Sequence, residues 1–363
     1  MRAEEIWKAS TGTGIKVAVI DTGVSASTAS LKGQVLDGFD ATKVKGEATD
    51  AFDGHGTTMA ELIAGTGAGG GLKGLAPGAR IIPIRISEND VQGGEQVNNF
   101  DTVDAIRAAA DSDAQIISMS FANDVRSVQE HDAVKYAQSK GKLFFAGVGN
   151  NAKKGNKKQY PAAYPEVVGV AGIDQDGRVG DYSQHGDVVD LAAPGSEIPG
   201  WCDNTFKRYC DADGTSNATA LASASAALIW SAHPDWTSNQ VLRVMIESAG
   251  RAKGTKAGAV SEYLGHGIIR PNTHLTHGVG KPGDPNINPL TNEKTLDTKS
   301  SPTPAASSSN GSQAKSDDKV AVAGSSEEAG GSGKTGWLIG GGAAVIALAA
   351  VGGFVAVRRK RTT

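Results

Sequence analysis

The chain has 363 residues, of which 39% are hydrophobic and 21% charged, so it can bury a large core. Its formal net charge is only −3 at pH 7, and the part predicted to fold has no basic stripe. This balance argues against a nucleic-acid-binding protein.

Hydrophobic runs alternate with helical patterns along residues 1–277. Runs that are hydrophobic at nearly every position are typical of strands buried on both faces. Their alternation with helices predicts right-handed crossovers, and hence an α/β fold with a mainly parallel sheet and helices on both faces. The predicted strands are residues 15–20, 81–86, 115–119, 143–146 and 167–171, and the predicted helices are 101–110, 128–140, 218–231 and 237–247.

Two polar residues stand at predicted element boundaries in the N-terminal part. Asp21 ends the first strand, at the edge of the sheet where such folds carry their active sites, although a turn or capping role is the simpler alternative. His55 opens a helix between Gly54 and Gly56, so its ring is accessible. A single histidine is more often structural, but glycine on both sides is unusual around a buried one.

Asn150 follows the predicted strand at 143–146, after Gly147 and Gly149. An amide at the carboxyl end of a strand can direct its NH₂ group at developing negative charge, as donors do in acyl-transfer enzymes. A turn is the alternative, because Asn151 and a lysine-rich segment come next.

Cys202 and Cys210 lie eight positions apart in a loop-like segment. They form either a local disulfide in an oxidising compartment or two free thiols in the cytosol. Neither has a second Cys or a His close enough in sequence to indicate zinc. Since no Asp-rich loop has the spacing of a calcium site, we predict no metal, and we predict no cofactor.

Ser216 lies within Gly-Thr-Ser-Asn-Ala, residues 214–218, which opens an alanine-rich segment predicted to be a buried helix. The hydroxyl of a serine at this position lies near the positive end of the helix dipole. Gly214 permits a sharp approach of the chain. Because most serines at a helix start are only N-caps, the pentapeptide does not by itself define a nucleophile.

The composition changes after residue 277. Residues 278–336 are rich in Pro, Ser, Gly, Thr and Lys, which predicts a flexible stalk. Residues 337–357 form an apolar and glycine run long enough to span a bilayer of about 30 Å, and the basic tail at 358–363 predicts a cytoplasmic C-terminus. This places a folded domain at 1–277 outside the cell membrane, which favours the disulfide.

The N-terminus conflicts with that placement, since residues 1–7 lack the apolar core of a signal peptide. We expect that a leader precedes Met1. A soluble cytoplasmic protein is the alternative.

Four short motifs occur in the order that subtilisin-like serine proteases show. Asp-Thr-Gly at Asp21, Gly-His-Gly-Thr at His55, Gly-Asn at Asn150 and Gly-Thr-Ser at Ser216 resemble this family, the subtilases, over about residues 13–250. The resemblance implies an Asp-His-Ser triad that cleaves peptide bonds through an acyl-enzyme. Ser216 is expected to attack the carbonyl, His55 to carry the proton, Asp21 to orient the imidazole, and Asn150 with the Ser216 N–H to bind the oxyanion.

The resemblance also assigns a substrate-binding strand. It implies that Ser118, Ser120 and Phe121 bind the peptide backbone and wall the first specificity pocket, with Gly147 and Gly149 in the same group. Ala122 and Asn123 stand where many members of the family have glycines.

Two further departures follow the serine, because Asn217 and Ala220 stand where the family usually has Met and Pro. They leave a non-catalytic or weakly catalytic scaffold of a membrane secretion complex as the alternative to an endopeptidase.

Within the family, the chain looks most like the mycosins, the membrane-anchored subtilases of actinobacterial type VII secretion. The likeness rests on an Ala-Glu-Glu-Ile-Trp lead-in, a Cys-bearing loop before the serine, the stalk, one C-terminal span and a basic tail. It implies protein or peptide substrates, a membrane tether and a type VII secretion complex as partner.

Overall fold

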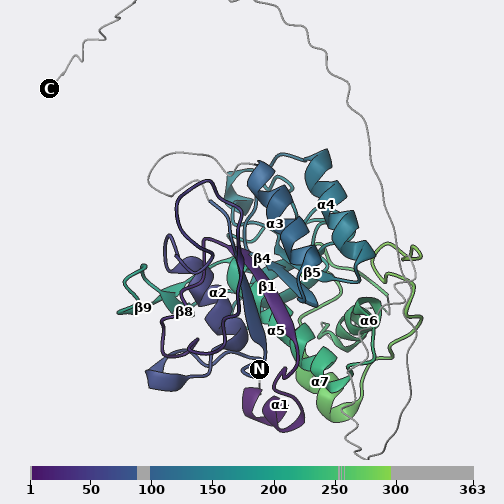
Figure 1. Ribbon diagram of the computed structural model, residues 1–363. Coiled ribbons are helices and arrows are strands. Elements are labelled where there is room, and N and C mark those ends of the chain that lie inside the picture. Colours follow the sequence, from purple (N-terminus) through teal and green to yellow (C-terminus); the bar gives the residue numbers. More distant parts are fainter. Residues whose placement is uncertain (1, 88–98, 252–253, 255, 257, 296–363) are drawn as a thin grey trace, which may run out of the picture. The chain divides into compact units, whose positions relative to one another are not determined.

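The computed structural model describes residues 2–87, 99–251, 254, 256 and 258–295 (Figure 1). The continuously hydrophobic runs of the sequence form parallel strands, in the order β2-β3-β1-β4-β5-β6-β7. The strands are β1 (Lys16–Asp21), β2 (Phe39–Asp40), β3 (Arg80–Arg85), β4 (Ile116–Met119), β5 (Leu143–Gly147), β6 (Val168–Ile173) and β7 (Leu191–Pro194). The predicted parallel α/β fold is therefore confirmed.

Helices cover both faces of this sheet. They are α1 (Ala3–Ala9), α2 (His55–Ala64), α3 (Asn99–Asp111), α4 (Val128–Ser139), α5 (Thr215–Ala232), α6 (Ser238–Ser248) and α7 (Pro271–His277). Because side chains alternate along a strand, Val17 and Val19 of β1 pack with α2, α5 and α6, whereas Ala18 and Ile20 pack with α3 and α4. The sheet thus separates two hydrophobic cores. The helices on either side of the sheet can be followed in Figure 1.

Helix α5 runs through the first of these cores. Its run of Ala and Ser side chains is small enough for the helix to lie close against β4, β5, β6 and β7, and its residues from Ala222 to Trp230 are all buried. It begins at Thr215 rather than at the predicted Ala218, so the serine lies in its first turn.

A two-stranded antiparallel hairpin, β8 (Ile198–Trp201) and β9 (Tyr209–Ala212), lies apart from the sheet and against α2 (Figure 1). The Cys202–Cys210 disulfide closes it, with Cα atoms 5.2 Å apart, so the predicted disulfide is confirmed.

The segment after α7 contacts the domain. Pro285 O accepts hydrogen bonds from the Thr237 hydroxyl and the Asn239 amide, and Asn288 is 5% exposed. Residues 278–295, the start of the predicted stalk, therefore pack near α6.

The rest of the predicted stalk, the span at 337–357 and the tail lie outside the described residues. None of the helices that are described has the length and apolar character required to cross a bilayer.

Candidate active site

The carboxyl ends of the parallel strands bring the predicted residues to one edge of the sheet. Asp21 is the last residue of β1, and Asn150 follows the end of β5. Helix α2 begins at His55, and Ser216 lies in the first turn of α5. Helices α2 and α5 pack against each other on one face of the sheet. Residues far apart in sequence therefore converge where such folds bind their ligands.

Asp21 and His55 form a direct hydrogen bond, with 2.7 Å between His55 Nδ1 and Asp21 Oδ1. The Asp21 side chain has no exposed surface, and the same oxygen accepts the Thr22 N–H at 2.8 Å. Because a carboxylate oxygen only accepts, Nδ1 of His55 carries the donated proton. This fixes the tautomer and makes Nε2 the basic nitrogen.

Asp53 orders the start of α2, a role that the sequence did not reveal. Its Oδ1 accepts the His55 N–H at 2.8 Å and the Thr22 hydroxyl at 2.6 Å. Gly56 is required for a different reason: a Cβ there would lie 2.3 Å from Gly23 O and 2.9 Å from Asp21 Oδ1. The glycine after the histidine therefore lets α2 approach the end of β1.

The Ser216 hydroxyl lies beside the residue that follows β4. It donates a hydrogen bond of 3.2 Å to Ser120 O, and its side chain is half-buried. Since it stands in the first turn of an 18-residue helix, the positive end of the helix dipole favours negative charge on its oxygen.

The Asn150 amide is oriented by Thr215. Asn150 Oδ1 accepts both the Thr215 N–H at 2.9 Å and the Thr215 hydroxyl at 3.0 Å, so the NH₂ group points the other way. A methyl group built on Gly214 would lie 3.7 Å from Asn150 Nδ2 and 3.8 Å from Ser216 N, with no other non-neighbouring heavy atom within 4 Å. The two donors thus border the same open space, as an oxyanion site requires.

Gly147 and Gly149 also contribute through Thr215. A Cβ at Gly147 would lie 2.7 Å from the Thr215 hydroxyl oxygen, and the Gly149 N–H donates to that oxygen at 3.3 Å. Gly149 has a φ of +105°, which side chains rarely adopt. Gly147 therefore lets the start of α5 lie against the end of β5, whereas a Cβ at Gly149 would collide with the Gln184 side chain.

The remaining predicted substrate-binding residues are all buried, Ser120 with 7% of its surface exposed. Ser120 supplies the carbonyl next to Ser216, whereas Ser118 is 0% exposed and Phe121 is 3% exposed. Ser118 lies inside β4, between Val19 of β1 and Phe145 of β5. Its side chain offers no surface to a peptide, so the predicted contact does not fit its position.

Asn217, a departure from the family pattern, has a structural role. Its side chain is 4% exposed, and Nδ2 donates to Ala212 O at 3.1 Å and to Gly195 O at 3.3 Å. This amide ties the first turn of α5 to the end of β9.

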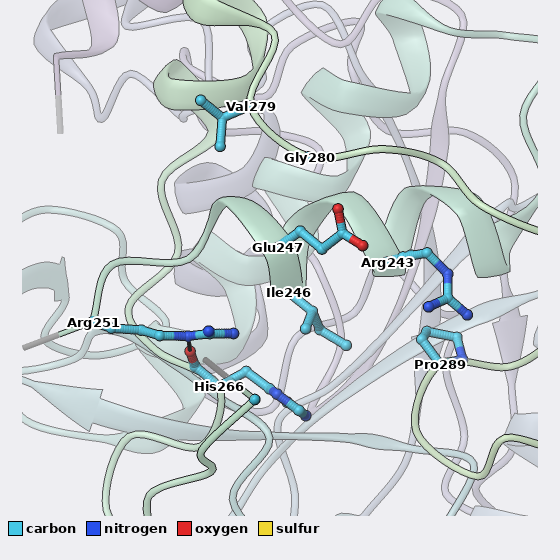
Figure 2. A pocket seen from close by; sticks show the side chains of 9 residues that line it. Arg243, Ile246, Glu247, Arg251, His266, Val279, Gly280 and Pro289 are labelled. Atoms are coloured by element: carbon cyan, nitrogen blue, oxygen red, sulfur yellow. Dashed lines mark hydrogen bonds between the residues drawn. The ribbon is translucent and has the colours of Figure 1, made fainter. Parts of the chain in front are cut away.

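A cavity of about 560 Å³ lies away from these residues, among α6, the segment after α7 and His266 (Figure 2). Arg243 and Glu247 of α6 and Arg251 line it, and burial lowers the pKa of His266 there. No predicted site residue lines this cavity. Within the described ranges, no group of three or more His, Cys, Asp or Glu side chains is placed to hold a metal ion.

Comparison with known families and proteins agrees with this geometry. The model of the subtilase family, Peptidase_S8, matches residues 12–267. Thermitase from Thermoactinomyces vulgaris is 34% identical over 233 residues, which cover 63% of this chain and 79% of thermitase. Subtilisin E from Bacillus subtilis is 33% identical over 267 residues, covering 71% of this chain and 65% of subtilisin E.

Solved structures show the same likeness. The MycP3 protease from the type VII (ESX-3) secretion system superposes with a TM-score of 0.64 at 29% identity, covering 76% of this chain and 86% of MycP3. MycP1 from Mycobacterium smegmatis superposes with a TM-score of 0.66 at 27% identity, covering 78% of this chain and 84% of MycP1. The chain is thus similar in structure to these mycosins, and by its family match and its relatives it belongs to the subtilase family of serine endopeptidases.

Proposed function

We propose that Asp21, His55 and Ser216 act as the catalytic triad of this endopeptidase. The observation that carries the proposal is the 2.7 Å bond between His55 Nδ1 and the buried Asp21, at the same edge of the sheet as Ser216. That bond leaves Nε2 to take the proton of the Ser216 hydroxyl as its oxygen attacks the scissile carbonyl. Asp21 then stabilises the imidazolium.

The oxyanion of the tetrahedral intermediate is bound by Asn150 Nδ2 and the Ser216 N–H, the two donors that border the space beside Gly214. His55 returns its proton to the leaving amine, which breaks the peptide bond and leaves an acyl-enzyme on Ser216. Water, deprotonated by His55, releases the acid and restores the hydroxyl.

Covalent labelling tests these roles. A fluorophosphonate probe should label the folded wild-type chain, and Ser216→Ala should abolish both labelling and cleavage while circular dichroism and thermal unfolding stay unchanged. A folded wild-type chain that takes no label would contradict the proposal.

We further propose a mycosin-type role, in which the peptidase domain is tethered to the outer face of the cell membrane and processes substrates of type VII secretion. The structural likeness to MycP1 and MycP3 supports it, as do the apolar run at 337–357 and the basic tail. Protease added to intact cells should degrade the domain. Protection until the cells are lysed would refute the outward placement.

A complementation experiment distinguishes an enzymatic role of the chain from a scaffold role. In a strain that lacks the gene, the wild-type chain should restore secretion and processing. If Ser216→Ala restores both, the role is a scaffold; if it restores secretion but not processing, the chain serves both purposes. The scaffold alternative rests on Asn217 and Ala220. The contacts of Asn217 with Ala212 and Gly195 are structural, and Ala220 is buried within α5.

A further inference from the structure

The disulfide-closed hairpin β8–β9 contacts α2 at its N-terminus (Figure 1). The Trp201 N–H donates to the Thr58 hydroxyl at 2.8 Å, and that hydroxyl donates to Gly54 O at 2.8 Å. The approach is close, since a Cβ at Gly54 would lie 2.7 Å from Trp201 Cβ. The backbone directly before His55 therefore rests on the hairpin.

A second contact lies further along α2. The Tyr209 hydroxyl donates to Glu61 Oε2 at 2.8 Å, and the Thr28 hydroxyl donates to Glu61 Oε1 at 2.7 Å. Tyr209 also accepts the Leu72 N–H at 3.2 Å. Glu61 is 0% exposed, so these two hydroxyls hydrogen-bond its carboxyl in place of water, and the nearby Trp201 side chain adds a further favourable contact.

The same hairpin leads directly into the nucleophile. Strand β9 ends at Ala212, and α5 begins at Thr215. The Asn217 amide donates back to Ala212 O. One short element therefore holds the helix of the histidine by side-chain hydrogen bonds and the helix of the serine by chain continuity.

We propose that Tyr209 and Glu61 are positioning residues, which hold α2 against the hairpin and so keep His55 aligned with Ser216. The inference rests on the proposed triad and adds to it two side chains that act through the position of α2. A hydrogen-bonded link of this kind affects the rate by geometry, and a misplacement of about 1 Å can cost about 100-fold.

The test uses the full-length chain and compares Tyr209→Phe with Tyr263→Phe. Tyr209→Phe removes only the hydroxyl, so kcat on a peptide substrate and the rate of fluorophosphonate labelling should fall about tenfold, with KM within twofold of wild type. Tyr263 is 51% exposed and stacks on His185, away from α2, so its Phe variant should match wild type.

A double variant separates positioning from stability. Tyr209→Phe alone leaves Glu61 with a buried oxygen that has lost its partner, so the thermal midpoint should fall. Adding Glu61→Leu removes that unpaired oxygen and should restore much of the midpoint, while kcat stays low because the link is still missing. If the thermal midpoint and kcat recover together, Tyr209 and Glu61 only stabilise the fold, and the proposal is overturned.

Glu61→Gln provides a second test, which is needed if Tyr209→Phe does not fold. An amide of the same shape can still hydrogen-bond both hydroxyls, so kcat should stay within twofold of wild type, whereas Glu61→Leu alone should lower it about tenfold. Equal kcat values for Glu61→Gln and Glu61→Leu would refute the proposed role of the Tyr209–Glu61 hydrogen bond. If the wild-type chain takes no fluorophosphonate label, the proposed triad fails instead, which is a separate outcome.

Discussion

Helices α2 and α5 each present one member of the proposed triad, but they are held in place by different forces. Helix α5 has no titratable side chain, and its interior is buried among β4, β5, β6 and β7. Helix α2 contains His55 and Glu61, and polar contacts from Asp21, Asp53 and the hairpin fix it. Both helices are buried, and hydrogen bonds also hold the first turn of α5. Beyond that turn α5 depends mainly on packing, whereas the position of the histidine depends on polar contacts along α2 as well.

Because of this difference, the two helices should respond to different substitutions. Changes of volume along α5 should lower stability with little effect on the rate of each folded molecule. Changes of hydrogen bonding around α2 should lower the rate, because imidazole orientation depends on directional contacts.

Asp21→Asn should have the largest effect of the variants that leave Ser216 in place. The amide NH₂ would face His55 Nδ1 and force the opposite tautomer, so kcat should fall about 10⁴-fold with little change in fold. Steady-state kinetics with one peptide substrate measure this. A loss below tenfold would show that the 2.7 Å bond does not set the tautomer.

Asn150→Ala should reduce kcat by about 10²–10³-fold with KM nearly unchanged, since it removes a donor used mainly in the transition state. That magnitude is the one known for the equivalent donor of subtilisin, a member of the same family. Asn150 also accepts from Thr215, so a matched thermal unfolding curve is required. A change confined to KM would contradict the oxyanion role.

Leu228→Ala tests the packing of α5. Leu228 is 0% exposed, so truncation should lower the free energy of unfolding by about 2–5 kcal/mol, as urea titration can measure. The fraction that remains folded should keep the wild-type kcat, counted by active-site titration with the fluorophosphonate. A tenfold lower kcat per titrated site would show that packing of α5 also sets the rate, and would contradict the proposed difference between α2 and α5.

Gly214→Ala should lower kcat/KM about tenfold without unfolding the chain. Its φ of 178° is extended backbone that alanine adopts freely, but the methyl group would enter the space that Asn150 Nδ2 and Ser216 N share. Adding Asn150→Ala to this variant should then lower kcat/KM by a smaller factor than Asn150→Ala does in the wild-type chain. Fully additive losses would indicate that the two changes act at separate places.

The smallest effect concerns pH, and of these two helices only α2 should contribute to it, since α5 has no titratable side chain. Burial raises the pKa of Glu61 above its usual 4.5, so the folded chain holds this proton more tightly than the unfolded chain. The stability that this adds is complete below pH 4.5 and is lost as pH rises through the higher folded pKa. Urea unfolding at several pH values should show this decline in wild type. The decline should be smaller in Glu61→Gln but still present, because burial also raises the pKa of Asp101, Glu130 and Asp190. Identical profiles would exclude Glu61 as a contributor.

Much of the fold could be predicted because its strands are continuous hydrophobic runs. The predicted strand at 15–20 corresponds to Lys16–Asp21, and the one at 143–146 to Leu143–Gly147. Strand β2 was missed because it has only two residues. The hairpin was missed because its Pro, Gly and Cys residues have no alternating pattern.

The site residues that belong to short sequence motifs could be predicted. Those that act through contacts between distant parts of the chain could not. The motifs pointed to Asp21, His55, Asn150 and Ser216, and the structure brings these to one edge. Nothing in the sequence connects Tyr209 with Glu61, which lie 148 positions apart. Burial likewise depends on the assembled sheet, which is why Ser118 was assigned to a surface that it does not reach.

The burial of Asn217 has a practical consequence. Asn217-Ala218-Thr219 fits the acceptor pattern for N-linked glycosylation, which a eukaryotic secretory pathway would recognise. A sugar on Nδ2 would prevent the 4%-exposed side chain from reaching Ala212 O and Gly195 O. Yeast or mammalian secretion should therefore give misfolded product, and a host without this modification is the suitable source of active enzyme.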